Sequence, residues 1–228
     1  EMGARVLLVD ADPQGDASIT YGINDERGLT NLLENHITAG GKYSTRDVIR
    51  KTRYPNIDVV PADGYLTCTA FNLSNISGPE QIFRFKTAIE EVRKDYDYCI
   101  CDCGRLLDTV VLNILVVADL VVSPIKAGGF EVSAVENLSM QIADIRGFNR
   151  NIEAKLLLNM ARNTLAFLGM EAWVKEKSGL DYFDTNIKQS TVIEQAALKQ
   201  IPLPEHDGKA DVTVSYRKVV EEIIREGV

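Results

Sequence analysis

Two aspartates, Asp10 and Asp12, directly follow a short apolar run near the beginning of the chain, in RVLLVDADPQGDAS (residues 5–18). A second apolar run, YDYCIC (96–101), is followed at once by Asp102. Two buried strands that each end in Asp suit a magnesium–phosphate site, because Mg²⁺ prefers hard oxygen ligands and often binds through carboxylates and waters. The open alternative is that Asp12 starts a turn with the following proline and accepts hydrogen bonds from nearby backbone N–H groups.

Apolar runs that alternate with helical patterns must position these carboxylates. The runs predict strands over residues 5–9, 57–61, 96–101, 119–125 and 154–159. Residues 78–96 and 131–147 have apolar side chains at helical spacing. Such alternation predicts an α/β fold with a doubly wound, mostly parallel sheet that carries helices on both faces. In such a sheet the functional groups gather at the carboxyl ends of the strands.

Length and composition limit the possible classes of protein. The chain has 228 residues, 45% of them hydrophobic, which predicts one domain over residues 1–228. The formal net charge of −8 argues against a surface built wholly to coat nucleic acid, although a local basic patch stays possible. Neither an apolar run of about 18 residues nor a signal peptide is visible, so we expect a cytoplasmic protein without a membrane span.

The four cysteines are Cys68, Cys99, Cys101 and Cys103. The last three alternate along a predicted strand, so their side chains share one face. This spacing differs from that of a zinc site and does not suit a disulfide. The cysteines therefore predict buried or half-buried reduced thiols, as expected in the cytosol.

The stretch VLLVDADPQGDAS resembles the deviant second Walker motif of the ParA/MinD family of P-loop ATPases, and most closely the ParA/Soj-type chromosome and plasmid partition proteins. Further segments resemble that family in the same order. They are NIDVVPAD, YDYCICDCGRLLDTVVLNIL, ADLVVSPIKAGGFEVSAVENL, LLLNMARN and TNIKQSTVIEQAALKQIPL. The resemblance covers nearly the whole chain and implies a P-loop NTPase-like fold.

The chain departs from the family pattern in two places. The family begins with a strand, a glycine-rich loop and a helix, but no G-x-x-x-x-G-K-[ST] occurs in these 228 residues. The resemblance therefore implies that the first strand and the P-loop are missing, which leaves open whether the chain as written hydrolyses ATP. Gly104 and Arg105 stand where the family usually has two prolines after its Walker B strand, so the geometry of switch II is open as well.

The resemblance implies roles for residues at the strand ends, with ATP and Mg²⁺ as cofactors. Asp12 would be catalytic and position the attacking water, Asp10 would support the Mg²⁺ shell, and Asp102 would hold Mg²⁺ through a water. Gln14, Gly15 and Asp16 would lie in switch I. Asn159 and Arg162 would flank the adenine, and Pro202 would line the base. Asn159 could equally cap a strand end, and Arg162 could be a solvated residue at a helix start.

The partners implied by the resemblance are DNA, a second copy of the chain and a ParB-like protein. ATP would drive a homodimer that binds DNA non-specifically on the nucleoid, and the ParB-like centromere-binding protein would stimulate hydrolysis. Candidate DNA-binding residues, each also readable as ordinary solvated surface, are Lys188, Lys199, Arg217 and Lys218.

Two alternatives stay open. One is a MinD-like membrane-associated positioning ATPase, although the C-terminal YRKVVEEIIREGV mixes glutamates with its basic residues, so we expect no stable membrane association. The other is a truncated, non-catalytic binding module of the same fold.

Overall fold

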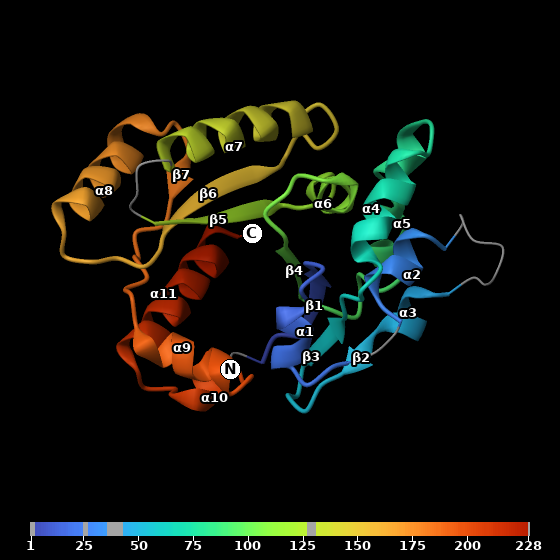
Figure 1. Cartoon of the computed structure of the whole chain (residues 1–228), viewed down its shortest axis with the longest axis horizontal. Helices are drawn as coiled ribbons and strands as arrows, with labels where there is room; N and C mark the ends of the chain where they lie inside the picture. Colours follow the sequence, from blue (N-terminus) through green and yellow to red (C-terminus); the bar gives the residue numbers. More distant parts are fainter. Residues whose placement is uncertain (1–2, 25–26, 36–42, 127–130, 228) are drawn as a thin grey trace. The chain divides into compact units, whose positions relative to one another are not determined.

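The computed structural model describes residues 3–24, 27–35, 43–126 and 131–227 (Figure 1). Contacts divide the chain into two compact units, Glu1–Val117 and Ala118–Val228. Each unit has its own sheet and its own buried apolar side chains. The single domain expected over residues 1–228 stays a prediction.

The sheet of the first unit has the strand order β2–β3–β1–β4. Its strands are β1 (Val6–Ala11), β2 (Arg50–Lys51), β3 (Ile57–Val60) and β4 (Tyr98–Cys103). β1 runs parallel to both β3 and β4, whereas β2 is antiparallel to β3. The three strands predicted in this unit are confirmed, and β2 was not predicted because its two residues are too short for a hydrophobic pattern.

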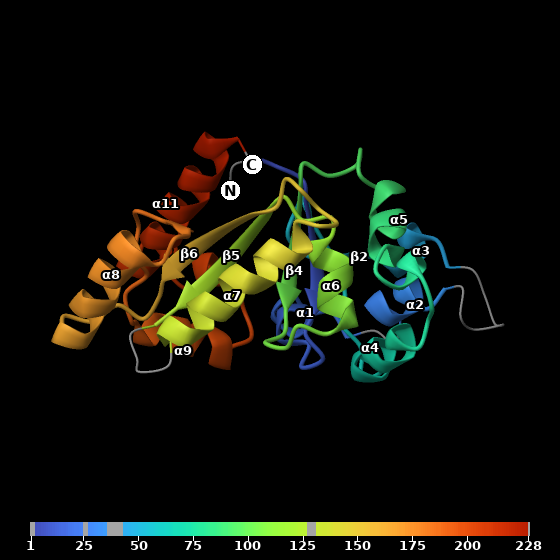
Figure 2. The same ribbon diagram turned by 90° about the horizontal axis from the view of Figure 1, so that it is seen from above.

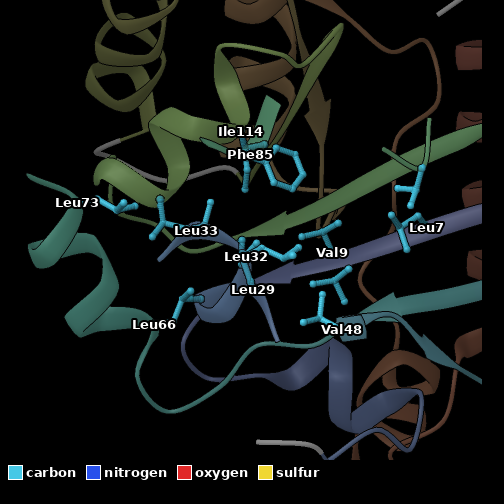
Figure 3. Close-up of a cluster of buried hydrophobic side chains, with 14 residues drawn as sticks. Leu7, Val9, Leu29, Leu32, Leu33, Val48, Leu66, Leu73, Phe85 and Ile114 are labelled. Carbon is cyan, nitrogen blue, oxygen red and sulfur yellow. The ribbon is translucent and has the colours of Figure 1, made fainter. Parts of the chain in front are cut away.

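One face of this sheet carries the hydrophobic core. The helices of this unit are α1 (Asp16–Thr20), α2 (Leu29–Leu33), α3 (Thr45–Val48), α4 (Leu66–Ser74), the 3₁₀ helix η1 (Pro79–Gln81), α5 (Arg84–Glu90) and α6 (Thr109–Leu115). Leu7 and Val9 point to the core, where the α2 leucines lie next to Val9 (Figure 3). Each fully buried leucine contributes about 1.5–3 kcal/mol. Burial of this face fixes the direction in which β1 presents its last residues.

The helix predicted over residues 78–96 is wrong as one continuous element. The chain instead forms η1 and then starts again with α5 at Arg84. The side-chain oxygen of Asn113, on α6, accepts hydrogen bonds from the backbone N–H groups of Arg84 (2.9 Å) and Phe85 (3.2 Å). These groups have no partner inside a helix that begins here, so a distant side chain caps α5.

The second unit contains the parallel strands β5 (Leu120–Ile125), β6 (Glu153–Leu158) and β7 (Asp181–Tyr182). Its helices are α7 (Glu131–Ile145), α8 (Leu165–Lys177), α9 (Thr191–Leu198), α10 (Leu203–His206) and α11 (Asp211–Glu226). Leu156 and Leu158 pack with residues of α7 and α8, whereas Leu157 packs with residues of α11. Figures 1 and 2 both show α7 running beside β5 and β6. The α/β class with parallel strands between helices is confirmed.

The cysteines only partly match their prediction. All four are free. Cys101 and Cys103 are half-buried as expected, but Cys68 and Cys99 are exposed, so the prediction of burial is wrong for these two. Cys99 lies on β4, an edge strand of the four-stranded sheet, and an edge strand leaves more of its side chains uncovered.

Candidate functional site

The carboxyl ends of β1 and β4 bring the predicted aspartates together. The parallel register pairs Asp10 with Asp102 and Ala11 with Cys103, where both strands end. Asp12 follows one residue later on the β1 side. Two apolar strands in parallel register therefore place three carboxylates at one edge of the sheet, as the sequence predicted.

Asp10 is completely buried and holds the start of α1. Its Oδ2 atom accepts hydrogen bonds from the backbone N–H (2.7 Å) and the hydroxyl (2.6 Å) of Ser18. Its Oδ1 atom accepts from the backbone N–H of Asp12 at 3.3 Å. These three hydrogen bonds give both oxygens of the buried carboxylate a partner. In this structure Asp10 anchors the segment that follows β1.

Asp12 lies in the tight turn between β1 and α1. Its Oδ1 atom accepts a hydrogen bond from the Gln14 N–H (2.9 Å), and its carbonyl accepts from the Gly15 N–H (2.9 Å). Gly15 has φ 69°, a left-handed conformation that glycine adopts at little cost, and α1 begins directly after it. The turn considered from the sequence is therefore present, and it uses only one carboxylate oxygen of Asp12.

The carboxylate of Asp12 also lies beside Gly104, the residue that follows β4. A Cβ atom placed on Gly104 would lie 3.7 Å from Asp12 Oδ2, in ordinary van der Waals contact. Any residue larger than glycine at this position would therefore touch the carboxylate. The glycine at position 104 therefore adds no side-chain contact to the Asp12 carboxylate.

Asp102 experiences the concentrated negative charge of this edge. Burial raises its pKa above the ordinary value, and the charges of Asp10, Asp12 and Asp16 raise it further. A raised pKa means that the charged carboxylate is disfavoured here, and a bound cation would offset that cost. In the described part of the chain, no group of three or more His, Cys, Asp or Glu side chains could hold a metal by itself. Mg²⁺ needs only one or two carboxylates from the protein when waters and phosphates complete its coordination shell, so the carboxylates at these strand ends fit this ion.

A hollow of about 520 Å³ lies beside these aspartates in the first unit. Asp16 and Asp102 contribute the acidic part of its wall. The remaining wall is formed mostly by apolar and aromatic side chains, and its residues are Leu8, Ala17, Thr20, Tyr21, Ile100 and Cys101.

The residues expected near a nucleotide base lie in the second unit. The Asn159 side chain accepts from the backbone N–H of Met160 (2.8 Å), as a cap at a strand end would. Arg162 donates to the side chain of Gln189, and a backbone bridge joins Ala161 to Lys188. The structure thus brings the loop after β6 beside residues 187–189, which the sequence did not predict. Pro202 directly precedes α10.

The basic candidates fall into two places in the second unit. Lys199 Nζ lies 3.3 Å from His206 Nδ1, and Arg217 donates to the carbonyl of Gly208 (2.6 Å), so both side chains meet residues 206–208. Lys218 is exposed on α11, and Lys188 is exposed beside the loop after β6.

The C-terminal helix α11 packs within its own unit, as the sequence predicted. Glu222 is 7% exposed, and its two oxygens accept hydrogen bonds from the backbone N–H groups of Asp184 (2.8 Å) and Thr185 (3.0 Å). Within the ranges that the structure describes, no helix is long and apolar enough to cross a membrane.

Sequence reasoning missed Ser18 as a member of this site. Ser18 is 4% exposed, and its hydroxyl also accepts from the backbone N–H of Ala62, in the loop after β3, at 3.2 Å. A small polar residue in the first helical turn after a strand-end aspartate was the only available signal, and the same pattern occurs at many solvated helix starts.

Comparison with known proteins identifies similar chains along almost the whole sequence. A family model described as "AAA domain" matches residues 1–155. The chain is 29% identical to the chromosome partitioning protein ParA of Caulobacter vibrioides (strain NA1000 / CB15N), over 97% of this chain and 83% of that protein. It is also 29% identical to the sporulation initiation inhibitor protein Soj of Bacillus subtilis (strain 168), over 99% of this chain and 88% of that protein.

A solved structure shares the fold. It is the cobyrinic acid a,c-diamide synthase of Mycobacterium smegmatis with a bound ATP analog and magnesium, at 20% identity and a TM-score of 0.80. The match covers 98% of this chain and 83% of that one. At this identity the likeness shows the fold alone.

Proposed function

The chain belongs to the ParA/MinD family of P-loop ATPases, and on this premise we propose that it is a ParA-type partition ATPase. The observation that carries the proposal is the edge where Asp10, Asp12 and Asp102 meet. Phosphoryl transfer in such enzymes depends mainly on positioning and charge neutralisation, so a few well-placed carboxylates suffice.

Asp12 orients the attacking water, with Oδ1 held in the turn by the Gln14 N–H and the carboxylate beside Gly104. Asp102 would hold Mg²⁺, through a water. When bound, Mg²⁺ neutralises negative charge on the phosphates. Asp10 supports the magnesium shell indirectly, because its bonds to Ser18 and Asp12 fix the segment between β1 and α1.

The remaining assignments concern the terminal phosphate in the first unit and the base in the second unit. Gln14, Gly15 and Asp16 form the switch that responds to the terminal phosphate. Asn159, Arg162 and Pro202 contact the base. The contact of the loop after β6 with residues 187–189 supports the assignment of Arg162, because a side chain held by Gln189 is already ordered.

ATP binding drives a homodimer that binds DNA without sequence preference, and a ParB-like protein stimulates hydrolysis. The similarity to the ParA and Soj proteins supports a role in partition. Two copies double a modest basic patch, so a net charge of −8 does not prevent phosphate contacts. The residues assigned to it are Lys188, Lys199, Arg217 and Lys218, which lie in more than one place in the second unit.

The test is a salt series of duplex-binding isotherms with ATP and Mg²⁺. It uses the loop-extended protein, meaning this chain preceded by the strand, glycine-rich loop and helix of the family pattern. Lys188→Glu with Lys199→Glu should weaken binding. It should also make the plot of log binding constant against log salt concentration less steep, because each phosphate neutralised contributes about −0.9 to its slope. ATP affinity should stay unchanged.

Lys94→Glu with Lys177→Glu is the matched control, because these exposed lysines lie outside the patch and the change in net charge is the same. Equal losses in both double variants would show a general charge effect and move the DNA surface elsewhere. Absence of duplex binding by the unmodified protein at low salt would contradict a partition ATPase.

A further inference from the structure

The buried hydroxyl of Ser18 joins two segments at the aspartate edge. It donates to Asp10 Oδ2 at 2.6 Å and accepts from the Ala62 N–H at 3.2 Å. The Ser18 backbone N–H also donates to Asp10 Oδ2, at 2.7 Å. One hydroxyl thus connects the end of β1, the first helix and the loop after β3.

The loop after β3, which contains Ala62, is itself held in place by the start of α2. The carbonyl of Pro61 accepts a hydrogen bond from the backbone N–H of Leu29 at 2.9 Å. Gly28 makes this approach possible, because a Cβ atom at that position would lie only 2.0 Å from the Pro61 oxygen. The start of α2 therefore holds the loop in place against the core.

The segment from Asp12 to Gly15 has fewer constraints. It is a surface turn with one left-handed glycine, and Pro13 and Gln14 are exposed. Besides the chain itself, a hydrogen bond from the Asp12 N–H to Asp10 Oδ1, at 3.3 Å, links this turn to the strand. The orientation of Asp12 consequently depends on how firmly the Asp10 carboxylate is held.

We propose that Ser18 is a positioning residue for Asp12, acting through Asp10. The Ala62 N–H polarises the Ser18 hydroxyl, the hydroxyl fixes the Asp10 carboxylate, and Asp10 fixes the backbone of Asp12. This role rests on the proposed ATP hydrolysis, because the direction of the Asp12 carboxylate matters for the rate at which water attacks ATP. Without the hydroxyl, Asp10 loses one of its two bonds at Oδ2 and the Ala62 N–H loses its acceptor.

The geometry is tested first in the 228-residue chain, by amide hydrogen exchange. Ser18→Ala should speed exchange at Asp12 and Ala62 by about fivefold, the effect of losing one ordinary hydrogen bond. Ser18→Thr keeps a hydroxyl and should restore the unmodified rates. Ser74→Ala is the matched control, because the Ser74 hydroxyl donates to a carbonyl within α4, away from this edge. Unchanged exchange in Ser18→Ala would overturn the connection.

The role in hydrolysis is tested in the loop-extended protein by single-turnover rates and ATP affinity. Ser18→Ala should lower the rate about 10–100-fold, the size expected for a misplaced catalytic group. The Kd for ATP should stay within about threefold, since the hydroxyl contacts protein groups. Ser18→Ala added to Asp12→Ala should cause no further loss, because Ser18 acts only through Asp12.

Three outcomes would overturn the proposal: a rate within about threefold of the unmodified protein, a loss of ATP affinity equal to the loss of rate, or additive effects with Asp12→Ala. A merely structural serine would lower affinity and rate together, so the split between them is the deciding readout. Absence of hydrolysis by the unmodified protein would contradict the proposed ATPase instead, and the exchange experiment would still decide the connection.

Discussion

At the scale of single residues, Asp12 has one carboxylate oxygen bonded within the turn, and its carboxylate lies beside Gly104. Asp12→Ala should therefore remove water orientation and leave the other groups at the edge in place. In the loop-extended protein, we expect hydrolysis to fall on the order of 10²–10⁴-fold, with ATP affinity largely retained. Single-turnover hydrolysis and calorimetric titration measure the two quantities.

The control for this variant is Glu80→Ala, which removes an exposed carboxylate on η1 in the same unit. Turnover of Asp12→Ala within about threefold of the unmodified protein would reduce Asp12 to a turn residue.

The cysteines of β4 differ in how readily they ionise. A hydrogen bond from the Cys101 thiol lowers the pKa of the exposed Cys99, whereas burial and nearby carboxylates raise the pKa of Cys103 to about 12. Because the thiolate is the nucleophile, Cys99 should react with iodoacetamide around neutral pH while Cys103 stays a thiol. Mass spectrometry over a pH series should show Cys103 alkylated only in strongly alkaline solution. Faster labelling of Cys103 than of Cys99 would contradict this order.

At the scale of elements, Asn113 decides where α5 begins. It is completely buried, its oxygen accepts from two N–H groups of α5, and its amide donates to the carbonyls of Gln81 (2.9 Å) and Thr109 (2.8 Å). Asn113→Ala leaves these backbone groups without their partner, so we expect a loss of about 2–4 kcal/mol in the free energy of unfolding. Urea unfolding of the 228-residue chain measures this loss.

Asn75→Ala is the matched control for Asn113→Ala, because Asn75 is exposed and donates a single hydrogen bond to the carbonyl of Phe71. Its expected effect is below about 0.5 kcal/mol. Equal stabilities of the two variants would mean that α5 does not need the cap.

At the scale of the whole molecule, ATP binding depends on groups beyond the aspartate edge. A glycine-rich loop supplies backbone N–H groups and a lysine to the phosphates, and its motif does not occur in these 228 residues. We therefore expect the chain by itself to bind Mg-ATP weakly or not at all, whereas the loop-extended protein should bind it. Calorimetric titration of both decides the matter, and micromolar binding by the 228-residue chain would refute the expectation.

Some strands and helices of this fold could be predicted from the sequence, and others could not. The strand pattern located β1, β3, β4, β5 and β6, because a buried parallel strand needs a continuous apolar run. The break between η1 and α5 could not be predicted, because the group that caps α5 is Asn113, distant in the sequence. The short strands β2 and β7 carry too few residues for any pattern.

The sequence by itself determined that Asp10, Asp12 and Asp102 stand at the ends of apolar strands, since residue type and period suffice for that conclusion. Only the tertiary structure decided their different environments. Asp10 accepts hydrogen bonds from Ser18 of α1, the Asp12 carboxylate lies beside Gly104, and burial together with neighbouring charges raises the pKa of Asp102. The physical reason is that burial, hydrogen bonding and charge repulsion depend on atoms from segments separated along the chain, which become neighbours only when β1 pairs with β4.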